Sequence, residues 1–308
     1  MLHLDAFISY LRYELYRSDH TVEAYRRDLL QFGAFFCTDP DSAFNPSDVS
    51  TTDIRRWLAN LADAGEAPAS LRRKTQSLRA YFRFLCRRKL MDINPADAVI
   101  LAKLPKPLPD FVRDADMERL LLPVAPDAPL TAHRDHLILH LLYATGLRRS
   151  EILQLTDTHI DLSIRQLRVL GKGRKERVVP IADELASEIA SWQTLRDESF
   201  PDLPHPRPLI ATRHGAMSPA NLEVTIKRLL KNENAGRKSP HTLRHTFATS
   251  MLNGGADLNS VRAILGHASL ATTQIYTHLQ TSDLRRAYTA AHPRARKGTD
   301  IPSAEDND

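Results

Sequence analysis

Three alternating prolines constrain this chain of 308 residues more than any other feature of its sequence. They are Pro105, Pro107 and Pro109. Proline lacks the amide hydrogen that a helix needs, and it pushes the residue before it into an extended conformation. A helix cannot run through residues 103–109, and few tertiary contacts can cross such a segment. We therefore expect a domain boundary near residue 107.

The sequence before this boundary has the apolar spacing of four helices. Ser18, Thr51 or Thr52, and Ser70 precede three of them as N-cap residues, and Gly65 ends the third. The helical spacing covers residues 4–15, 22–36, 54–61 and 71–85. We expect the first domain, residues 1–107, to be a helical bundle.

Positive charge is concentrated in the last of these helices. The formal net charge of the chain is only +5, yet residues 70–107 hold ten Lys and Arg against two Asp and Glu. Such a local excess points to a polyanion partner, with nucleic acid as the obvious candidate. A solvated helix face would have the same composition. The residues expected to contact DNA phosphates are Arg72, Arg73, Lys74, Arg79 and Arg83.

The sequence after the boundary changes period. Short strands are predicted at 158–162, 166–170 and 175–181, and Gly171-Lys172-Gly173 is the turn between the last two. Helical spacing recurs at 137–142, 151–155, 183–196, 219–231, 240–253, 257–265 and 270–278. We therefore expect a mainly α protein with a small antiparallel β-sheet. Its second, mixed α/β domain would span residues 108–292, and the polar residues 293–308 would be disordered.

Several classes of protein are disfavoured. No apolar run approaches 18 residues, and the N-terminus lacks a basic-then-apolar signal segment, so neither a membrane span nor export is expected. Cys37 and Cys86 lie in apolar helical patterns, as small core residues in a reducing compartment do, and we expect a cytoplasmic protein. No group of Cys and His has the spacing of zinc ligands, and we expect neither a metal nor a cofactor.

Four segments of the second domain carry reactive side chains. They are ATGLRRSEI around Arg148, GKGRKERVVP around Lys172, HTLRHTFAT around His241 and Arg244, and LGHASLATTQIYTH around His267 and Tyr276. Each segment alone is ambiguous, because an arginine at a helix start is usually solvated and a lysine in a turn usually serves solubility.

Together these side chains suit phosphoryl transfer without a metal. The transition state at a phosphodiester spreads negative charge over the non-bridging oxygens, and guanidinium forks can bind those oxygens in pairs. A tyrosine can attack phosphorus and hold it as a covalent ester. A lysine on a mobile turn can protonate the oxygen that is expelled.

In order and spacing, the four segments resemble those of the tyrosine recombinases, the phage-integrase family, and within it the Xer group. The stretch HTVEAYRRDLLQFGAFF resembles the family's core-binding domain, a SAM-like helical bundle, and NPADAVILAKLPKPLP resembles its inter-domain linker. The likeness extends over residues 3–290. It implies an enzyme that cuts and rejoins DNA strands and needs no ATP, because the phosphotyrosine conserves the energy of the broken bond.

The resemblance implies roles for the phosphate-binding side chains. Arg148 and Arg244 would bind the scissile phosphate. His241 would hydrogen-bond the phosphate and help to take the tyrosine proton, and His267 would support the phosphate. Glu151 matches an acidic position that supports the site without doing chemistry.

The resemblance also implies the nucleophile and the acid. Tyr276 would form a 3′-phosphotyrosine, and Lys172 would protonate the departing 5′ oxygen. Among their neighbours, we expect His245 to be a hydrogen-bonded core residue and His278 to face away from the site. The residues expected to be phosphate contacts or solvent charges, and not catalysts, are Arg174, Lys175 and Arg177.

The partners implied by the resemblance are double-stranded DNA with paired half-sites and three further protomers. The assembly would be a homo- or hetero-tetramer, with a second Xer recombinase and a DNA translocase of the FtsK type as candidate partners. The core-binding segment begins almost at once, which favours resolution of chromosome or plasmid dimers over the integrase or transposase of a mobile element. A swivelase like type IB topoisomerases and a non-catalytic DNA-binding regulator are the rival functions.

A last apolar stripe follows Tyr276. Leu284, Ala287, Tyr288 and Ala291 are spaced as one face of a helix. We expect a pocket on a neighbouring protomer to cover this stripe, and the chain's own second domain is the alternative.

Overall fold

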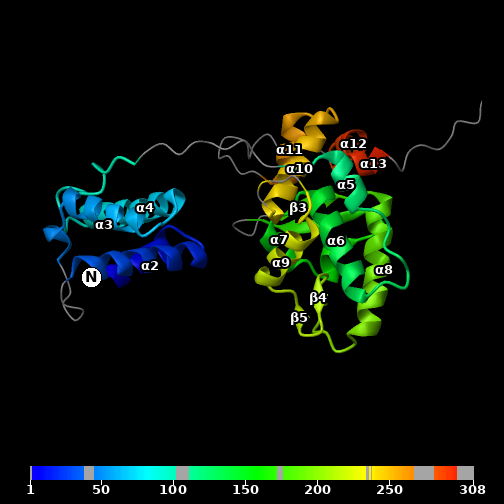
Figure 1. The fold of residues 1–308 in the computed structure, drawn as a ribbon, viewed down its shortest axis with the longest axis horizontal. Helices are drawn as coiled ribbons and strands as arrows, with labels where there is room; N and C mark the ends of the chain where they lie inside the picture. The colour runs from blue at the N-terminus through cyan, green and yellow to red at the C-terminus, as the bar shows by residue number, and fades with distance from the viewer. Residues whose placement is uncertain are drawn as a thin grey trace, which may run out of the picture. The chain divides into compact units, whose positions relative to one another are not determined.

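The computed structural model describes residues 2–37, 45–101, 111–171, 176–233, 236, 238–266 and 281–296. The chain forms two compact units, Met1–Pro107 and Leu108–Asp308 (Figure 1). The first unit is helical, and the second combines helices with small antiparallel sheets, so the predicted fold class is confirmed.

The first unit is built from four main helices. The elements are α1 Leu4–Ser9, the π-helical turn η1 Tyr10–Glu14, α2 Asp19–Phe36, the short 3-10 helix η2 Pro46–Asp48, α3 Thr51–Asp63 and α4 Pro68–Arg87. Ser18 caps α2 as expected, since its side chain accepts from the amide of Thr21. The cap of α3 is Ser50, which forms a capping box with Asp53, and α4 begins at Pro68, before Ser70.

One aromatic core holds the first unit together. Phe32 of α2 meets Trp57 of α3 edge to face, with ring centroids 5.2 Å apart. Phe7 of α1 meets Tyr81 of α4 in the same way at 5.5 Å. All four rings are almost fully buried. Each such ring removes a large apolar area from water, which is the main term that stabilises a small bundle.

The second unit contains fifteen elements in the part of the chain that the structure describes. They are α5 Asp114–Leu120, α6 Leu130–Thr145, α7 Arg149–Gln154, η3 Asp157–His159, β1 Ile160–Asp161, β2 Gln166–Leu170, β3 Glu176–Pro180, α8 Asp183–Ser199, β4 Ala211–Thr212, β5 Gly215–Ala216, α9 Pro219–Leu229, α10 Pro240–Asn253, α11 Leu258–Leu265, α12 Thr281–Ala291 and α13 Pro293–Arg296. Neither α5 nor the β4–β5 hairpin was expected from the sequence.

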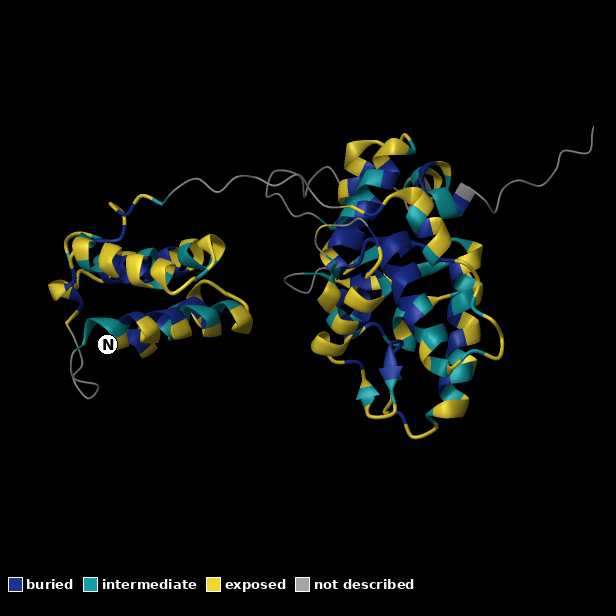
Figure 2. Cartoon of the chain, in the orientation of Figure 1, coloured by how far each residue is buried: buried dark blue, intermediate teal, exposed yellow. Residues whose placement is uncertain are grey.

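Helix α6 is the centre of the second unit. From residue 137 to 145 every side chain is buried, and the helix packs against α8 and α10 (Figure 2). A helical segment that is buried on all sides belongs in a core. Gly146 ends α6 in the left-handed conformation, at φ 60°.

The three-stranded sheet is antiparallel, in the order β1-β2-β3. Leu167 of β2 pairs with Val179 of β3, and both side chains are fully buried. Side chains alternate between the two faces of a strand, so Arg177 shares the inward face with Val179. The predicted turn at Lys172 lies outside the described residues.

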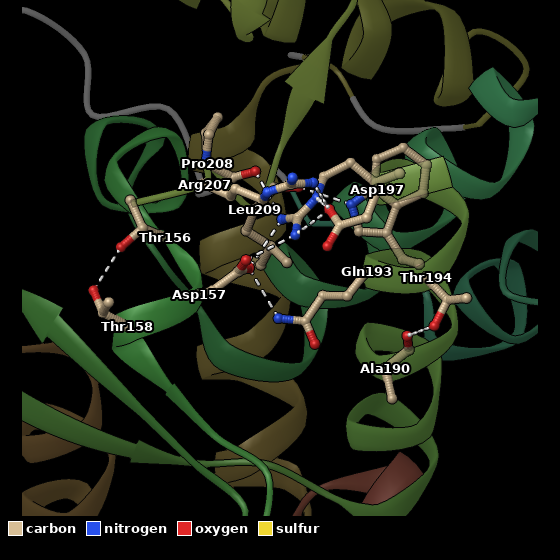
Figure 3. A network of polar contacts seen from close by, with 12 residues as sticks. Thr156, Asp157, Thr158, Ala190, Gln193, Thr194, Asp197, Arg207, Pro208 and Leu209 are labelled. Carbon is tan, nitrogen blue, oxygen red and sulfur yellow. Dashed lines mark hydrogen bonds and ion pairs between the residues drawn. The ribbon is translucent and has the colours of Figure 1, made fainter. Parts of the chain in front are cut away.

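A buried arginine fixes the chain that follows α7. Arg196 of α8 is fully buried, and its guanidinium donates to both carboxylate oxygens of Asp157 at 2.8 and 2.9 Å, to Asp197 at 2.8 Å and to the carbonyl of Pro208 at 2.9 Å (Figure 3). The amide of Leu209 also donates to the carbonyl of Leu155 at 2.8 Å. The C-terminal end of α7 and the start of the sheet are therefore held on a rigid base.

Helix α12 packs on its own unit. Tyr288 and Ala291 are 1% and 2% exposed and belong to the main core, and Leu284 packs against it. The ring of Tyr288 stacks on His292 at 5.2 Å. Burial lowers the pKa of His292 to about 3, so the imidazole is neutral and its Nε2 donates to the carbonyl of Tyr143 at 3.3 Å. The expectation that a neighbouring protomer covers this stripe is wrong for α12.

The expected start of the disordered tail, residue 293, is too early in the sequence. Residues 293–296 form α13, in which Ala295 is 7% exposed. Arg294 donates to Glu184 at 2.6 Å and to the carbonyl of Leu121 at 2.7 Å. Residues 293–296 are therefore part of the second unit, and Arg294 forms an ion pair with it. In the described parts of the chain no helix is both long and apolar enough to cross a membrane.

Candidate active site

Arg148 is aimed by the first turn of α7. It is the N-cap residue of that helix, and the Glu151 carboxylate accepts from its backbone amide at 2.8 Å. The same carboxylate accepts from Arg148 Nη1 at 2.6 Å, while Nη2 donates to the carbonyl of Gly266 at 3.0 Å. A short helix start thus fixes both the backbone and the guanidinium of this residue.

Arg244 lies in the interior of the second unit. It sits on α10, which starts with Ser239 as N-cap and Pro240 at the first position. Its Nη1 donates to the carbonyl of Gly146 at 2.6 Å, and its Nη2 donates to the carbonyl of Leu265 at 2.7 Å. Burial lowers the pKa of Arg244 to about 10, and the nearby charge of Arg148 adds to the effect. The group stays cationic at neutral pH, in a place that favours an incoming anion.

Arg177 completes this cluster, although it was expected to be a phosphate contact or a solvent charge. Its Nη1 and Nη2 donate to the two oxygens of Glu151 at 2.8 and 2.9 Å. Its side chain is only 12% exposed. Burial acts to raise the pKa of Glu151, but the hydrogen bonds from Arg177 and Arg148 outweigh burial and lower it to about 2. The signal for this placement was strand parity, since Arg177 shares its face with the buried Val179.

Three arginines hold the end of α11. Arg177 Nε donates to the carbonyl of Ile264 at 2.8 Å. The next two carbonyls, of Leu265 and Gly266, accept from Arg244 and Arg148. The last carbonyls of a helix have no partner within it and carry the negative end of the helix dipole. Among the residues that the structure describes, three guanidinium groups and the Glu151 carboxylate give this cluster a surplus of two positive charges.

His241 lies one turn before Arg244 on α10 and is exposed. Its Nε2 is 3.0 Å from Nε2 of His245, and the two rings meet edge to face at 4.4 Å. The expectation that His245 is hydrogen-bonded is confirmed. Its expected place in the core is wrong, because it is half-buried and pairs with the exposed His241.

The remaining predicted catalytic residues lie outside the described residues. They are Lys172, His267 and Tyr276, and the same holds for Arg174, Lys175 and His278. In sequence, His267 directly follows Gly266, whose carbonyl accepts from Arg148. Within the described ranges, no group of three or more His, Cys, Asp and Glu could hold a metal ion.

The basic helix α4 of the first unit divides into buried and exposed cations. Lys74 is 5% exposed, and its ammonium bonds to Gln31 and lies 3.7 Å from Asp28. Arg79 donates to the carbonyls of residues 96 and 99 at 3.1 and 2.6 Å. These two residues therefore hold the first unit together. The exposed members of the predicted set are Arg72, Arg73 and Arg83, of which Arg73 also forms an ion pair with the buried Asp28.

Comparison with known proteins identifies the family. Residues 111–283 match the model of the Phage integrase family, and residues 4–89 match that of the phage integrase N-terminal SAM-like domain. The chain belongs to the phage integrase family. The arginine cluster lies in the larger of these two matches and the basic helix α4 in the smaller.

The relatives of this phage integrase family member include the tyrosine recombinases XerC of Chlorobaculum tepidum and Pseudomonas putida KT2440. The first is 36% identical over 95% of this chain and 94% of its own length. The second is 37% identical over 96% of this chain and 98% of its own length. A solved structure of the XerH site-specific recombinase bound to difH substrate covers 87% of this chain and 78% of its own, with 25% identity and a TM-score of 0.64.

These findings confirm the predicted chemistry at the level of the family. The chain is a tyrosine recombinase, an enzyme that breaks and rejoins DNA strands through a catalytic tyrosine. A topoisomerase-like swivelase and a regulator without catalysis are not favoured.

Proposed function

We propose that this chain is a site-specific recombinase of the Xer type, acting through a 3′-phosphotyrosine. The observation that carries the proposal is the pair of fixed guanidinium groups, Arg148 and Arg244, in a cluster with surplus positive charge. A DNA phosphodiester is an anion of the size that two such groups can bind together. The depressed pKa of Arg244 adds support, since an anion beside it would relieve the repulsion from Arg148.

In the proposed reaction, both arginines stabilise charge on the non-bridging oxygens of the scissile phosphate. The phenolic oxygen of Tyr276 attacks phosphorus, and the bond from phosphorus to the 5′ oxygen breaks. The tyrosine proton passes to His241, and Lys172 protonates the departing 5′ oxygen. His267 supports the phosphate. Rejoining reverses these steps with a 5′ hydroxyl from the partner strand, so no energy source is consumed.

His245 supports the role given to His241. The contact between their Nε2 atoms requires one ring to donate and the other to accept. A proton that reaches His241 can therefore be shared with its neighbour one turn further along α10.

We propose that the first unit binds duplex DNA, with Arg72, Arg73 and Arg83 as phosphate contacts on the exposed face of α4. Four protomers would hold two sites, either alone or with a second Xer recombinase. A DNA translocase of the FtsK type would activate the assembly in the cytoplasm. The biological role would be resolution of chromosome or plasmid dimers during chromosome partition and cell division. The XerC names of the relatives and the XerH structure with its difH substrate support this proposal.

The test uses a duplex selected from a random library by the full-length protein. A nicked version of that duplex traps the covalent adduct, because the short cut strand diffuses away. We expect the parent protein to form an adduct that survives denaturation, and Tyr276→Phe to bind the duplex equally and form none. An adduct formed by Tyr276→Phe would refute the assignment of the nucleophile, and no adduct with the parent would refute the proposed chemistry.

A further inference from the structure

Arg177 has no step in the proposed reaction, yet it joins three elements of the site. It extends from β3, it binds both oxygens of Glu151 on α7, and its Nε donates to Ile264 at the end of α11. A side-chain carbon on Gly266 would lie only 3.0 Å from its Cδ, so the arginine also packs against the C-cap of α11.

The Glu151 carboxylate is shared between two arginines. Two N–H groups reach it from Arg148, one from the backbone and one from the guanidinium, and two reach it from Arg177. Glu151 is buried, with 3% of its side chain exposed. When a buried carboxylate has two cationic partners, some N–H groups of one partner stay available to another ligand. A buried carboxylate with a single partner holds that partner tightly, since nothing else offsets its charge.

We propose that Arg177 is a positioning residue for phosphodiester cleavage. It fixes the Glu151 carboxylate and the end of α11, so that the guanidinium groups of Arg148 and Arg244 stay aligned as a pair and available to one phosphate. The inference rests on the proposed function and adds to it a residue that acts through Glu151 and the end of α11. Without Arg177, Glu151 draws Arg148 to itself, and the local surplus of positive charge falls from two to one.

Lysine cannot replace this arginine fully. The planar guanidinium binds two oxygens with parallel N–H groups and still offers Nε to Ile264, whereas an ammonium presents a single point of charge. We therefore expect Arg177→Lys to keep the charge balance and to lose the alignment of α11 with the carboxylate.

The experiment measures single-turnover cleavage of the selected nicked duplex at saturating enzyme. Arg177→Met is expected to cleave up to about 10²-fold slower than the parent, the order of loss that a displacement of about 1 Å causes. Arg177→Lys is expected to fall between the two. The matched control is Arg168→Met, because Arg168 lies on the adjacent strand β2, is exposed, and donates to the carbonyl of Thr158, away from the arginine cluster. The control is expected to cleave at the parent rate.

One further readout separates positioning from a general loss of structure. Adding Glu151→Gln to Arg177→Met is expected to restore part of the lost rate, because the carboxylate that traps Arg148 is gone. A variant that is merely unstable would not recover.

The outcomes are distinct. A parent protein that forms no adduct overturns the proposed function and this role with it. If the parent cleaves and Arg177→Met cleaves at the same rate, only the role of Arg177 is overturned. The same holds if the rate losses of Arg177→Met and Glu151→Gln simply add in the double variant. If Arg177→Met does not fold, parent-rate cleavage by Arg177→Lys overturns the role, and a loss of about tenfold supports it.

Discussion

At the scale of single residues, two glycines with a left-handed backbone provide carbonyl acceptors for Arg148 and Arg244. Gly146 has φ 60° and accepts from Arg244, and Gly266 has φ 65° and accepts from Arg148. A side chain on Gly146 would lie 2.6 Å from the ring of Phe247. Backbone geometry that only glycine adopts easily thus places the acceptors for both guanidinium groups.

The arginine pair should matter for rate more than for binding. Arg148→Ala and Arg244→Ala are each expected to slow cleavage of the nicked duplex by about 10²–10³-fold, the usual effect of removing one donor to a charged transition state. DNA affinity should change far less, because most phosphate contacts lie elsewhere. Adduct formation and gel-shift titration, made on the same preparations, separate the two quantities. Parent-rate cleavage by either variant would remove that arginine from the site.

The depressed pKa of Glu151 predicts acid lability. Its pKa falls from an ordinary 4.5 to about 2 in the folded protein. The ionised form is thus stabilised by folding, and this stability is present above pH 4.5 and is lost as the pH falls toward 2. The loss should be about 3 kcal/mol in the free energy of unfolding.

Glu151→Gln tests that expectation, because the amide cannot titrate. Denaturant unfolding between pH 6 and 2 should show a smaller decrease in stability for the variant than for the parent. Equal decreases in the two proteins would mean that other carboxyl groups govern the acid response.

At the scale of elements, the cations of α4 are expected to serve two purposes. Exposed side chains contact DNA phosphates, and buried side chains stabilise the first unit. Each phosphate contact contributes roughly 0.9 to the slope of log affinity against log salt. The double variant Arg72→Ala, Arg83→Ala should therefore flatten that slope by up to about 2. Lys74→Met is the control, because its ammonium is buried beside Asp28. It should lower the stability of the first unit and leave the slope unchanged. If Lys74→Met changed the salt slope and the double variant did not, the assignment of exposed and buried cations to these two purposes would be wrong.

The packing of α12 makes a prediction about the unassembled protein. Truncation of a fully buried aromatic side chain costs about 3–5 kcal/mol, so Tyr288→Ala should destabilise the second unit by that order without DNA or neighbouring protomers. Leu252→Ala on α10 is the control, since Leu252 is 43% exposed. If Tyr288→Ala unfolded at the parent denaturant concentration and failed only in assembly, the stripe of α12 would belong to a protein interface.

The elements that could be predicted from sequence are those with a strong period or a strong cap. The helix α6 with its apolar run at 137–142, the paired strands β2 and β3, and the helix capped by Ser18 all follow local rules. The β4–β5 hairpin has only two residues in each strand, too few to show a period. The stripe of α12 was recognised, but spacing alone does not say which surface covers it.

At the scale of the whole molecule, the candidate site depends on contacts between distant segments. The pairing of Arg148 with Glu151 is local, three residues apart, and its motif could be found from sequence. The contacts of Arg177 span 26 residues to Glu151 and 87 to Ile264. No spacing rule covers such distances, and the basic surroundings of Arg177 in GKGRKERVVP suggested an exposed charge instead.

The capture of three helix-end carbonyls by arginines has an entropic consequence. An unrestrained arginine side chain carries about 2 kcal/mol of rotamer freedom. Folding has already withdrawn much of that freedom from Arg148 and Arg244, because carbonyl oxygens hold them in place. A phosphate that binds to the remaining N–H groups does not have to order the side chains again. The advantage is the same for every phosphodiester, whatever bases flank it, so discrimination between DNA sites must arise in other parts of the chain.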